Sequence, residues 1–303
     1  MAVDMRNLTA PSHRGKLWAI VLAAGEKMRP TVPMRALHGR DLPKQLASWW
    51  GHGMFLKRTL DRIGKMIPRN RTVVVLADPC RALAESHLRG YPDVECIYQP
   101  DNRGTGAEVL LPLAHVLARD PQARVVVFPS DHHVEHDAPF QTAVRRALVA
   151  ADLSPRGVAV IGAVAESATV ELDWIDCRDS LGASAAHARE VKRFVEKPGA
   201  AVALDLLTRG ALWNTMILAS RGRSLWGMAD RCVPNVCRLF MTYRALIGHR
   251  SSDDFLRDIY SQLPVTDLGR DILYAAEGLG VVPMRHAGWS PDRSMGPTLT
   301  TSA

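Results

Sequence analysis

The stretch Leu17-Trp-Ala-Ile-Val-Leu-Ala-Ala24, with Gly25-Glu-Lys-Met-Arg29 directly after it, decides the fold of this chain. A continuous apolar run of this kind, with no polar residue on either face, is typical of a strand that is buried on both sides. The small residues at its end, Ala23, Ala24 and Gly25, let main-chain N–H groups come close to a ligand. We therefore expect a buried strand that ends in a ligand-binding turn.

Two basic side chains accompany this turn. Arg29 follows it closely, and Lys44 comes after Pro43 one loop later, where the proline ring restricts the backbone. A guanidinium and an ammonium held in place can neutralise phosphate oxygens. We expect Arg29, Lys44 and the turn from Leu22 to Gly25 to bind a nucleoside triphosphate. The simpler alternative is that the turn serves only packing and that Lys44 is solvated.

The composition is that of an ordinary globular protein, with 303 residues of which 47% are hydrophobic and 23% are charged. No apolar stretch approaches the roughly 20 residues that span a bilayer, and the first sixteen residues lack the apolar core of a signal peptide. We expect a cytoplasmic protein with a flexible tail over 1–16, a nucleotide-binding domain over 17–290 and a C-terminal tail over 291–303.

The net charge of +7 raises the question of a nucleic-acid partner. The chain has neither a long run of basic residues nor basic residues interleaved with aromatic ones, so we expect no such partner. A basic surface also suits a protein whose substrates are phosphorylated anions. The five cysteines lack CxxC spacing, which favours buried thiols in a reducing compartment.

Strand patterns and helix patterns alternate along the first two hundred residues, and helix patterns dominate beyond about residue 220. The alternation predicts an α/β fold with a mostly parallel mixed sheet and helices on both faces. In such folds, ligands bind outside the carboxyl ends of the strands. The expected strands cover 17–23, 72–77, 94–98, 124–128, 158–164, 191–195 and 212–218, and the expected helices cover 54–67, 79–89, 106–118, 139–151, 200–208, 238–247 and 253–262.

An acidic residue stands at the carboxyl end of the strand expected over 124–128. There Pro129 and Ser130 lead into Asp131, whose carboxylate suits a hard cation that bridges triphosphate oxygens. Asp131 is therefore the expected metal ligand, and the alternative is that it caps the following turn. Three histidines follow closely, but without a partner cysteine we expect no zinc site from His132, His133 and His136.

The segment Gln99-Pro-Asp-Asn102-Arg-Gly104-Thr105-Gly ends one expected strand and opens the next helix. Asn102 and Thr105 are residue types that commonly cap a helix. Side-chain amides, and backbone groups that glycine exposes, can also bind the edge of a purine. We expect Gln99, Asn102, Gly104 and Thr105 beside a nucleotide base, and capping is compatible with this role.

Two further motifs suit a sugar phosphate. Phe194-Val-Glu196-Lys197-Pro ends a strand with adjacent opposite charges, so that Lys197 can neutralise a phosphate while Glu196 accepts hydrogen bonds from sugar hydroxyls. Asn214, beside Trp213, is a residue type that suits a pyranose. Each motif alone is more often structural, and their order along the chain gives them weight.

In this order, the motifs resemble those of the sugar-1-phosphate nucleotidyltransferases, above all the mannose-1-phosphate guanylyltransferases. The resemblance covers residues 17–290 and implies a Rossmann-like fold of the nucleotide-diphospho-sugar transferase type. It implies the reaction of GTP with mannose 1-phosphate, which gives GDP-mannose and pyrophosphate and uses Mg²⁺. It further implies that Arg29, Lys44 and Asp131 are catalytic, that Leu22, Ala23, Ala24, Gly25 and Ser130 contact the nucleotide, and that Glu196, Lys197 and Asn214 contact the mannose phosphate.

The chain departs from the family pattern in three places. Lys27 stands where the family has a second glycine in the first loop. A leucine and Asp173 precede Trp-Ile where the family has tyrosine and glycine, so Asp173 joins the expected substrate contacts. Pro291 separates Ser290 from Asp292, and the carboxylate that the family places directly after the serine, as a second metal ligand, comes one residue late.

These departures keep two alternatives open. One is a nucleotidyltransferase for another base or another sugar 1-phosphate, and the other is a catalytically weak regulatory protein that binds a nucleotide sugar. The expected partners are GTP and a sugar 1-phosphate, with no nucleic acid and no membrane. A homo-oligomer is left open.

Overall fold

The computed structural model describes residues 17–24, 55–180 and 188–291 of the 303-residue chain. Five residues that carry part of the expected site, namely Gly25, Lys27, Arg29, Lys44 and Asp292, lie outside the described residues. The division into two tails and one domain stays a prediction. No helix in the described ranges is long and apolar enough to cross a membrane.

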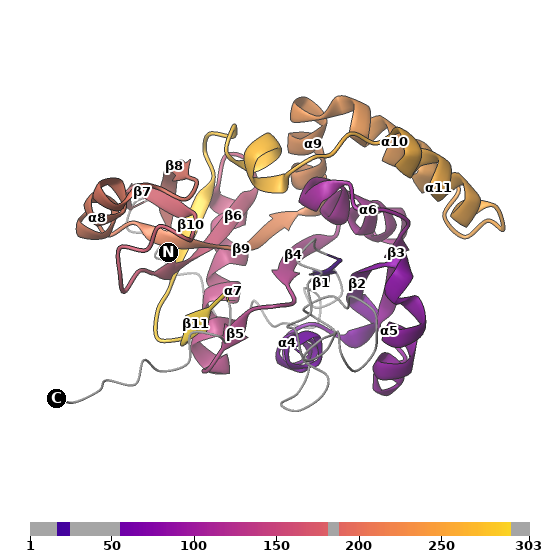
Figure 1. The fold of residues 1–303 in the computed structure, drawn as a ribbon, viewed down its shortest axis with the longest axis horizontal. Coiled ribbons are helices and arrows are strands. Elements are labelled where there is room, and N and C mark those ends of the chain that lie inside the picture. Colours follow the sequence, from indigo (N-terminus) through magenta and orange to yellow (C-terminus); the bar gives the residue numbers. More distant parts are fainter. Residues whose placement is uncertain (1–16, 25–54, 181–187, 292–303) are drawn as a thin grey trace, which may run out of the picture.

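A nine-stranded mixed sheet forms the centre of the described structure (Figure 1). Its strand order is β3-β2-β1-β4-β9-β6-β10-β8-β7, and a separate two-stranded sheet pairs β11 with β5. The strands are β1 (Leu17–Ala23), β2 (Thr72–Ala77), β3 (Glu95–Gln99), β4 (Arg124–Pro129), β5 (His133–Val134), β6 (Val158–Val164), β7 (Trp174–Ser180), β8 (Arg189–Val195), β9 (Leu212–Arg221), β10 (Gly280–Met284) and β11 (Trp289–Ser290).

Helices cover both faces of this sheet. One face packs against α4, α5 and α7, and the other packs against α6, α9, α10 and α11 (Figure 1). The helices are α4 (Phe55–Gly64), α5 (Arg81–His87), α6 (Gly104–Arg119), α7 (Asp137–Leu153), α8 (Ala200–Thr208), α9 (Gly222–Cys232), α10 (Pro234–Arg244) and α11 (Ser252–Gln262), with short 3₁₀ turns η3 (Arg69–Arg71), η4 (Asp78–Cys80) and η5 (Leu88–Gly90) and the π-helix η6 (Leu268–Leu273).

The predicted α/β class with a mixed sheet is confirmed. Fewer of its strand pairs are parallel, however, than the alternation of strand and helix patterns in the sequence indicates. β3, β2, β1 and β4 are parallel to one another, and β10 is parallel to β6. β9 is antiparallel to β4 and β6, and β8 is antiparallel to β7 and β10. The reason is that parallel neighbours need a crossover connection, whereas β7 and β8 follow each other after only eight residues, 181–188.

Helices dominate after residue 220, as expected, but β10 is a central strand that the sequence pattern does not predict. Its residues Gly280–Met284 lie between β6 and β8 in the sheet, with Pro283 opposite Gly162 of β6. A proline cannot donate a ladder hydrogen bond and argues against a central strand, which is why the sequence pattern conceals this one. β8 pairs with β10 only at Gly280 and Val281, so Pro283 lies beyond that ladder.

Most other expected elements are present within a few residues of their predicted ends. The predicted bounds are the observed ones for β1, β2, β6 and α8. The structure also contains elements that the sequence patterns do not predict, among them β7, α9 and η6. The cysteines are free thiols, but the expectation that they are buried holds fully only for Cys80 and Cys237, and Cys232 is exposed.

The burial of β1 on both faces, which its apolar run predicts, positions the functional edge of the sheet. Ile20 belongs to the core cluster on one face and Val21 to the cluster on the other. Leu22 lies opposite Pro129 of β4, and β2 and β3 continue the same parallel ladder on the other side. The carboxyl ends of these four strands therefore meet at one edge.

Candidate active site

A pocket lies where β1, β2 and β3 end. It brings together Ala24, Gln99 and Asn102, which the sequence motifs place beside a nucleotide. Its volume of about 240 Å³ exceeds the 140 Å³ of a second pocket on the outer side of β3. The remaining lining residues are Ala77, Pro79, Pro100 and Asp101.

Gln99, the last residue of β3, is buried, and a hydrogen bond from Tyr260 orients its side-chain amide. Its Oε1 accepts a hydrogen bond from the hydroxyl of Tyr260 on α11 at 3.3 Å. Burial, with a smaller contribution from the charge of Glu108, raises the pKa of Tyr260, so its hydroxyl stays protonated and donates. With this one bond made, Gln99 can still offer its amide nitrogen as a donor and the second lone pair of its oxygen as an acceptor to a base. The sequence motifs do not include Tyr260. The one sequence feature that could have indicated it is a tyrosine, with its polar hydroxyl, on the apolar face of a helix.

Asn102 shapes the turn that opens α6. Its Oδ1 accepts a hydrogen bond from the N–H of Gly104 at 2.9 Å. Gly104 has a φ of +83°, and a Cβ at this position would lie 2.4 Å from the carbonyl oxygen of Thr266. Glycine is therefore required by backbone conformation and by close packing. The turn-forming role of Asn102 is visible in the structure, and a contact with a base stays a prediction.

Thr105 connects α6 with the π-helix η6. Its hydroxyl donates to Asp267 Oδ2 at 3.0 Å and accepts from the N–H of Leu268 at 2.8 Å. The hydroxyl therefore holds the segment before η6 instead of capping its own helix. A position beside the base, which the motif implies for Thr105, stays a prediction.

Glu108 is a site residue that the motifs miss. Its side chain, on α6, is 4% exposed, and its Oε1 accepts a hydrogen bond from the N–H of Ala24 at 2.9 Å. Burial, with a smaller contribution from the charge of Asp131, raises the pKa of Glu108 to about 7. The available signal was a lone acidic residue in the otherwise apolar part of a helix pattern. Glu108 holds the main chain where the nucleotide-binding turn begins.

The end of β4 places Ser130 and Asp131 beside β1. The N–H of Ser130 donates to the carbonyl of Leu22 at 3.0 Å. Within the described residues, the buried hydroxyl oxygen of Ser130 has no hydrogen-bond partner. This oxygen, next to a half-buried carboxylate, is the kind of donor that a hard cation takes, so the residues fit a divalent ion. In the described ranges, no three His, Cys, Asp or Glu side chains come together as a metal site, and the expectation that the three histidines bind no zinc stays a prediction.

The C-terminal segment returns to this edge. In the two-stranded sheet of β5 and β11, Trp289 lies opposite Val134 and Ser290 opposite His133. His133 is two residues beyond Asp131, so the pairing brings the chain before Asp292 to the predicted metal ligand. Asp292 lies outside the described residues, and its role as a second ligand stays a prediction.

A second group of expected residues gathers around Asp173, where β7 begins, β8 ends and β9 begins. The carbonyl oxygen of Asp173 accepts the N–H of Asn214 at 2.8 Å, and its Oδ1 accepts the N–H of Lys197 at 3.2 Å. Its Oδ2 accepts the hydroxyl of Tyr274 at 2.8 Å. The structure thus joins three residues that the motifs assign to the sugar phosphate.

Backbone strain marks the same place. Lys197 has a φ of +33° and Met216 a φ of +55°, values that non-glycine residues rarely adopt. Asn214 Oδ1 accepts the N–H of Met216 at 3.0 Å. The ammonium of Lys197 makes no ion pair with the described residues, whereas Glu196 Oε1 accepts a hydrogen bond from Arg270 at 3.0 Å. Lys197 is therefore the cation that is available to a phosphate.

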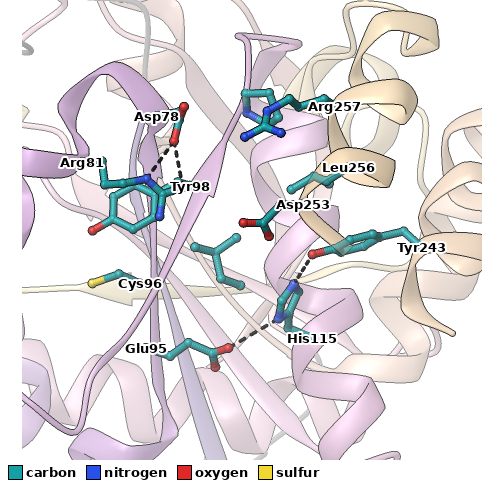
Figure 2. A pocket seen from close by; sticks show the side chains of 12 residues that line it. Asp78, Arg81, Glu95, Cys96, Tyr98, His115, Tyr243, Asp253, Leu256 and Arg257 are labelled. Carbon is teal, nitrogen blue, oxygen red and sulfur yellow. Dashed lines mark hydrogen bonds and ion pairs between the residues drawn. The ribbon is translucent and has the colours of Figure 1, made fainter. Parts of the chain in front are cut away.

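A different pocket lies on the outer side of β3, and Figure 2 shows its side chains. Its polar groups largely satisfy one another. His115 is 3.1 Å from the hydroxyl of Tyr243 and 3.4 Å from Glu95, and Glu95 accepts two hydrogen bonds from Arg119. These bonds connect α6 and α10 with the edge strand, and none of the predicted site residues lines this pocket.

Comparison with known proteins adds to this geometry. The model of the family described as Nucleotidyl transferase matches residues 19–231, more than half of the chain. The mannose-1-phosphate guanylyltransferase ManC of Salmonella typhimurium is 26% identical over 285 residues, which cover 91% of this chain and 57% of that protein. The xanthan biosynthesis protein XanB of Xanthomonas campestris is 25% identical over 280 residues, 89% of this chain and 56% of that protein. The chain thus spans little more than half the length of these curated relatives.

A solved structure has the same fold. The protein of Thermus thermophilus described as mannose-1-phosphate geranyltransferase superposes with a TM-score of 0.77 at 25% identity, over 91% of this chain and 76% of that one. The predicted nucleotide-diphospho-sugar transferase fold is confirmed.

Proposed function

Because the chain belongs to the nucleotidyl transferase family, we propose that it transfers a guanylyl group from GTP to mannose 1-phosphate, which forms GDP-mannose and releases pyrophosphate. ManC, a mannose-1-phosphate guanylyltransferase, and the Thermus protein, described as a mannose-1-phosphate geranyltransferase, support mannose 1-phosphate as the acceptor. The observation that carries the proposal is the grouping of the expected residues: Lys197 and Asn214 meet at Asp173, and Ala24, Gln99 and Asn102 line one pocket.

The nucleotide subsite is proposed at the pocket of Ala24, Gln99 and Asn102. The bond from Tyr260 orients the Gln99 side chain, whose amide nitrogen can donate to an acceptor on the purine edge. Glu108 holds the N–H of Ala24 and so sets the direction of the chain toward the expected phosphate-binding turn. Arg29 and Lys44, outside the described residues, are proposed to neutralise the triphosphate.

Mg²⁺ is the proposed cofactor, since enzymes of this kind act on a metal-bound nucleoside triphosphate. When bound, a divalent ion neutralises phosphate charge and orients the triphosphate. Asp131 and the hydroxyl of Ser130 are the described residues that would hold it. Asp131→Asn is expected to raise the Mg²⁺ concentration for half-maximal activity by roughly 10-fold or more, since a charged ligand is lost. An unchanged Mg²⁺ titration in this variant would remove Asp131 from the metal site.

The reaction that this arrangement supports is a direct displacement. A phosphate oxygen of the sugar phosphate forms a bond to the α-phosphorus of GTP while the bond from that phosphorus to the bridging oxygen breaks, and pyrophosphate leaves with the bonding electrons. Lys197 holds the attacking phosphate and the turn after β1 holds the nucleotide. Catalysis then comes from positioning and from charge neutralisation, without a covalent enzyme intermediate.

The presence of Asp173 supports a second candidate function, in which the same reaction uses a different sugar 1-phosphate. A carboxylate where the family pattern has glycine changes the surface that meets the sugar, so another sugar 1-phosphate is the main alternative acceptor. A pyrophosphate-release assay with GTP, ATP, UTP and dTTP against several hexose 1-phosphates separates the candidates. GTP with mannose 1-phosphate is expected to give the highest kcat/KM. Nucleotide-sugar binding without pyrophosphate release would instead indicate a regulatory protein.

A further inference from the structure

Asp173 and Tyr274 form a hydrogen-bonded pair that the sequence motifs do not contain. Asp173 directly precedes β7, and Tyr274 directly follows the π-helix η6. Their bond, at 2.8 Å, joins segments 101 residues apart in the chain. π-Helical turns are rare and are frequent at functional sites. This turn begins at the segment held by Thr105 and ends with a phenol beside the expected sugar-phosphate residues.

Tyr274 is held in place as a hydrogen-bond donor. Its ring is half-buried and stacks on Phe194, with ring centroids 4.5 Å apart and an interplanar angle of 18°. Burial, and after it the negative charge of Asp173, raises the pKa of the Tyr274 hydroxyl. The hydroxyl therefore stays protonated at neutral pH and donates to the carboxylate.

Asp173 is fixed from three directions. Its main chain binds Asn214, and its two carboxylate oxygens accept from the Lys197 N–H and from Tyr274. The positive φ of Lys197 persists because such contacts hold it, since an isolated residue would relax to a more favourable conformation. One carboxylate thus sets the backbone of the residue whose ammonium is proposed to hold the sugar phosphate.

Asp173 retains capacity for a ligand. A carboxylate has about four acceptor positions, and the structure shows two of them in use. The phenol oxygen of Tyr274 can also accept a hydrogen bond while it donates one, and the Asn214 side chain competes for this position, since its hydrogen bond acts to lower the pKa of Tyr274. Together Asp173 and Tyr274 present acceptors, and one negative charge, beside the backbone of Lys197, whose ammonium makes no ion pair with the described residues. Sugar hydroxyls are the donors that match this arrangement.

We propose that Asp173 and Tyr274 are the sugar-selecting pair of the acceptor subsite. The pair accepts hydrogen bonds from hydroxyls of a neutral hexose 1-phosphate, and it disfavours a sugar that lacks the matching hydroxyl or carries its own carboxylate. This inference rests on the proposed function and adds Tyr274 to it. A site built to bind a hydroxyl rejects the analogue without it far more strongly than an apolar site would, because buried polar groups are left unpaired.

Steady-state pyrophosphate release tests the pair. The proteins are the wild type, Tyr274→Phe, Asp173→Asn and the matched control Tyr243→Phe, which also loses one phenol hydroxyl, the partner of His115 in the outer pocket. Each is assayed with GTP and mannose 1-phosphate, with the monodeoxy mannose 1-phosphates and with mannuronic acid 1-phosphate. Thermal unfolding of each protein shows whether it is folded.

Tyr274→Phe is expected to raise the KM for mannose 1-phosphate by roughly 10-fold, the usual effect of losing a hydrogen bond to a charged group, and to leave the KM for GTP unchanged. The wild type is expected to reject at least one deoxy analogue, and this discrimination is expected to shrink in Tyr274→Phe and Asp173→Asn but not in Tyr243→Phe. If all four proteins have equal KM values for mannose 1-phosphate and discriminate equally against the deoxy analogues, the proposal that Asp173 and Tyr274 select the sugar is wrong, while the proposed function stands. Absence of pyrophosphate release by the wild type with every nucleotide and sugar overturns the proposed function, and the pair with it.

Discussion

The two halves of the sheet build their binding groups in different ways. In the half made of β3, β2, β1 and β4, parallel strands end at one edge, where Ala24, Gln99 and Ser130 lie at or just after a strand end. In the half made of β9, β8 and β7, the strands are antiparallel, so the beginning of β7 lies beside the end of β8 and the beginning of β9. The π-helix, distant in sequence, adds the side chain of Tyr274 to this junction. The strands of the first half are all expected from the sequence pattern, whereas β7 and the π-helix of the second half are not.

This difference predicts separable kinetics. Changes in the parallel half are expected to alter turnover or the KM for GTP. Changes at the β7–β8–β9 junction are expected to alter the KM for the sugar phosphate. A variant that changes both equally would show that the halves form one undivided site.

The largest effect is expected from the basic residues of the first loops. Arg29→Ala and Lys44→Ala remove charge that is proposed to stabilise the phosphates in the transition state, so each is expected to lower kcat by roughly 10²-fold or more. Single-turnover GMP transfer with saturating substrates measures this loss. Near-wild-type rates in both variants would place the phosphate site elsewhere.

A smaller and more selective effect is expected at Lys197. Its ammonium is proposed to hold the sugar phosphate, so Lys197→Ala is expected to raise the KM for mannose 1-phosphate by roughly 10-fold, the effect of one lost charge-assisted contact, with little change in the KM for GTP. Initial rates over a grid of both substrate concentrations separate the two constants. A change confined to the KM for GTP would reverse the assignment of the two halves.

Glu108 tests the parallel half without touching a basic residue. Glu108→Ala leaves the buried N–H of Ala24 without an acceptor and is expected to raise the KM for GTP several-fold, on the order of one lost hydrogen bond. Glu108→Gln retains an oxygen at the same place and serves as the control, with a KM for GTP near that of the wild type. Equal values in the two variants would show that the bond to Ala24 does not position the turn.

Glu108 also predicts a pH dependence of stability in protein kept free of divalent metal. Its folded pKa, about 7, lies above the ordinary value of 4.5, so the unfolded chain loses this proton first as the pH rises. The free energy of unfolding should therefore fall between about pH 4.5 and 7, by up to about 3 kcal/mol at 1.4 kcal/mol per unit. Urea unfolding at several pH values checks this, and Glu108→Gln should lose this component. An identical pH profile in that variant would contradict it.

The smallest effect is expected at the outer edge of β3. Burial acts to raise the pKa of Glu95, but the hydrogen bond with His115 and the charge of Arg119 outweigh it and leave the pKa lowered. A lowered carboxyl pKa stabilises the fold above its ordinary value, and this stability is lost as the pH falls through the lowered pKa. Glu95→Gln is expected to lower the free energy of unfolding at pH 7 by about 1 kcal/mol and to leave both KM values unchanged. A changed KM for either substrate would mean that this pocket communicates with the site.

The difference between the halves also explains what the sequence can predict. Three strand ends can be predicted from the sequence, because each apolar strand and the residues at its end are contiguous. They are the ends at Ala24, at Gln99 and before Asp131. Tyr274 has no such signal, since its place beside Asp173 depends on chain folding over a hundred residues. Glu108 and Tyr260 lie on apolar helix faces, where the pattern indicates only burial.

The most direct test of the proposed function is product identification by ³¹P NMR. Purified protein is incubated with GTP, mannose 1-phosphate and Mg²⁺, and the phosphorus resonances are followed with time. The account predicts loss of the GTP and mannose 1-phosphate signals with equal formation of GDP-mannose and pyrophosphate, faster than with UTP or dTTP in place of GTP. A persistent mixture of unreacted GTP and mannose 1-phosphate, under conditions where UTP or dTTP does react, would contradict it.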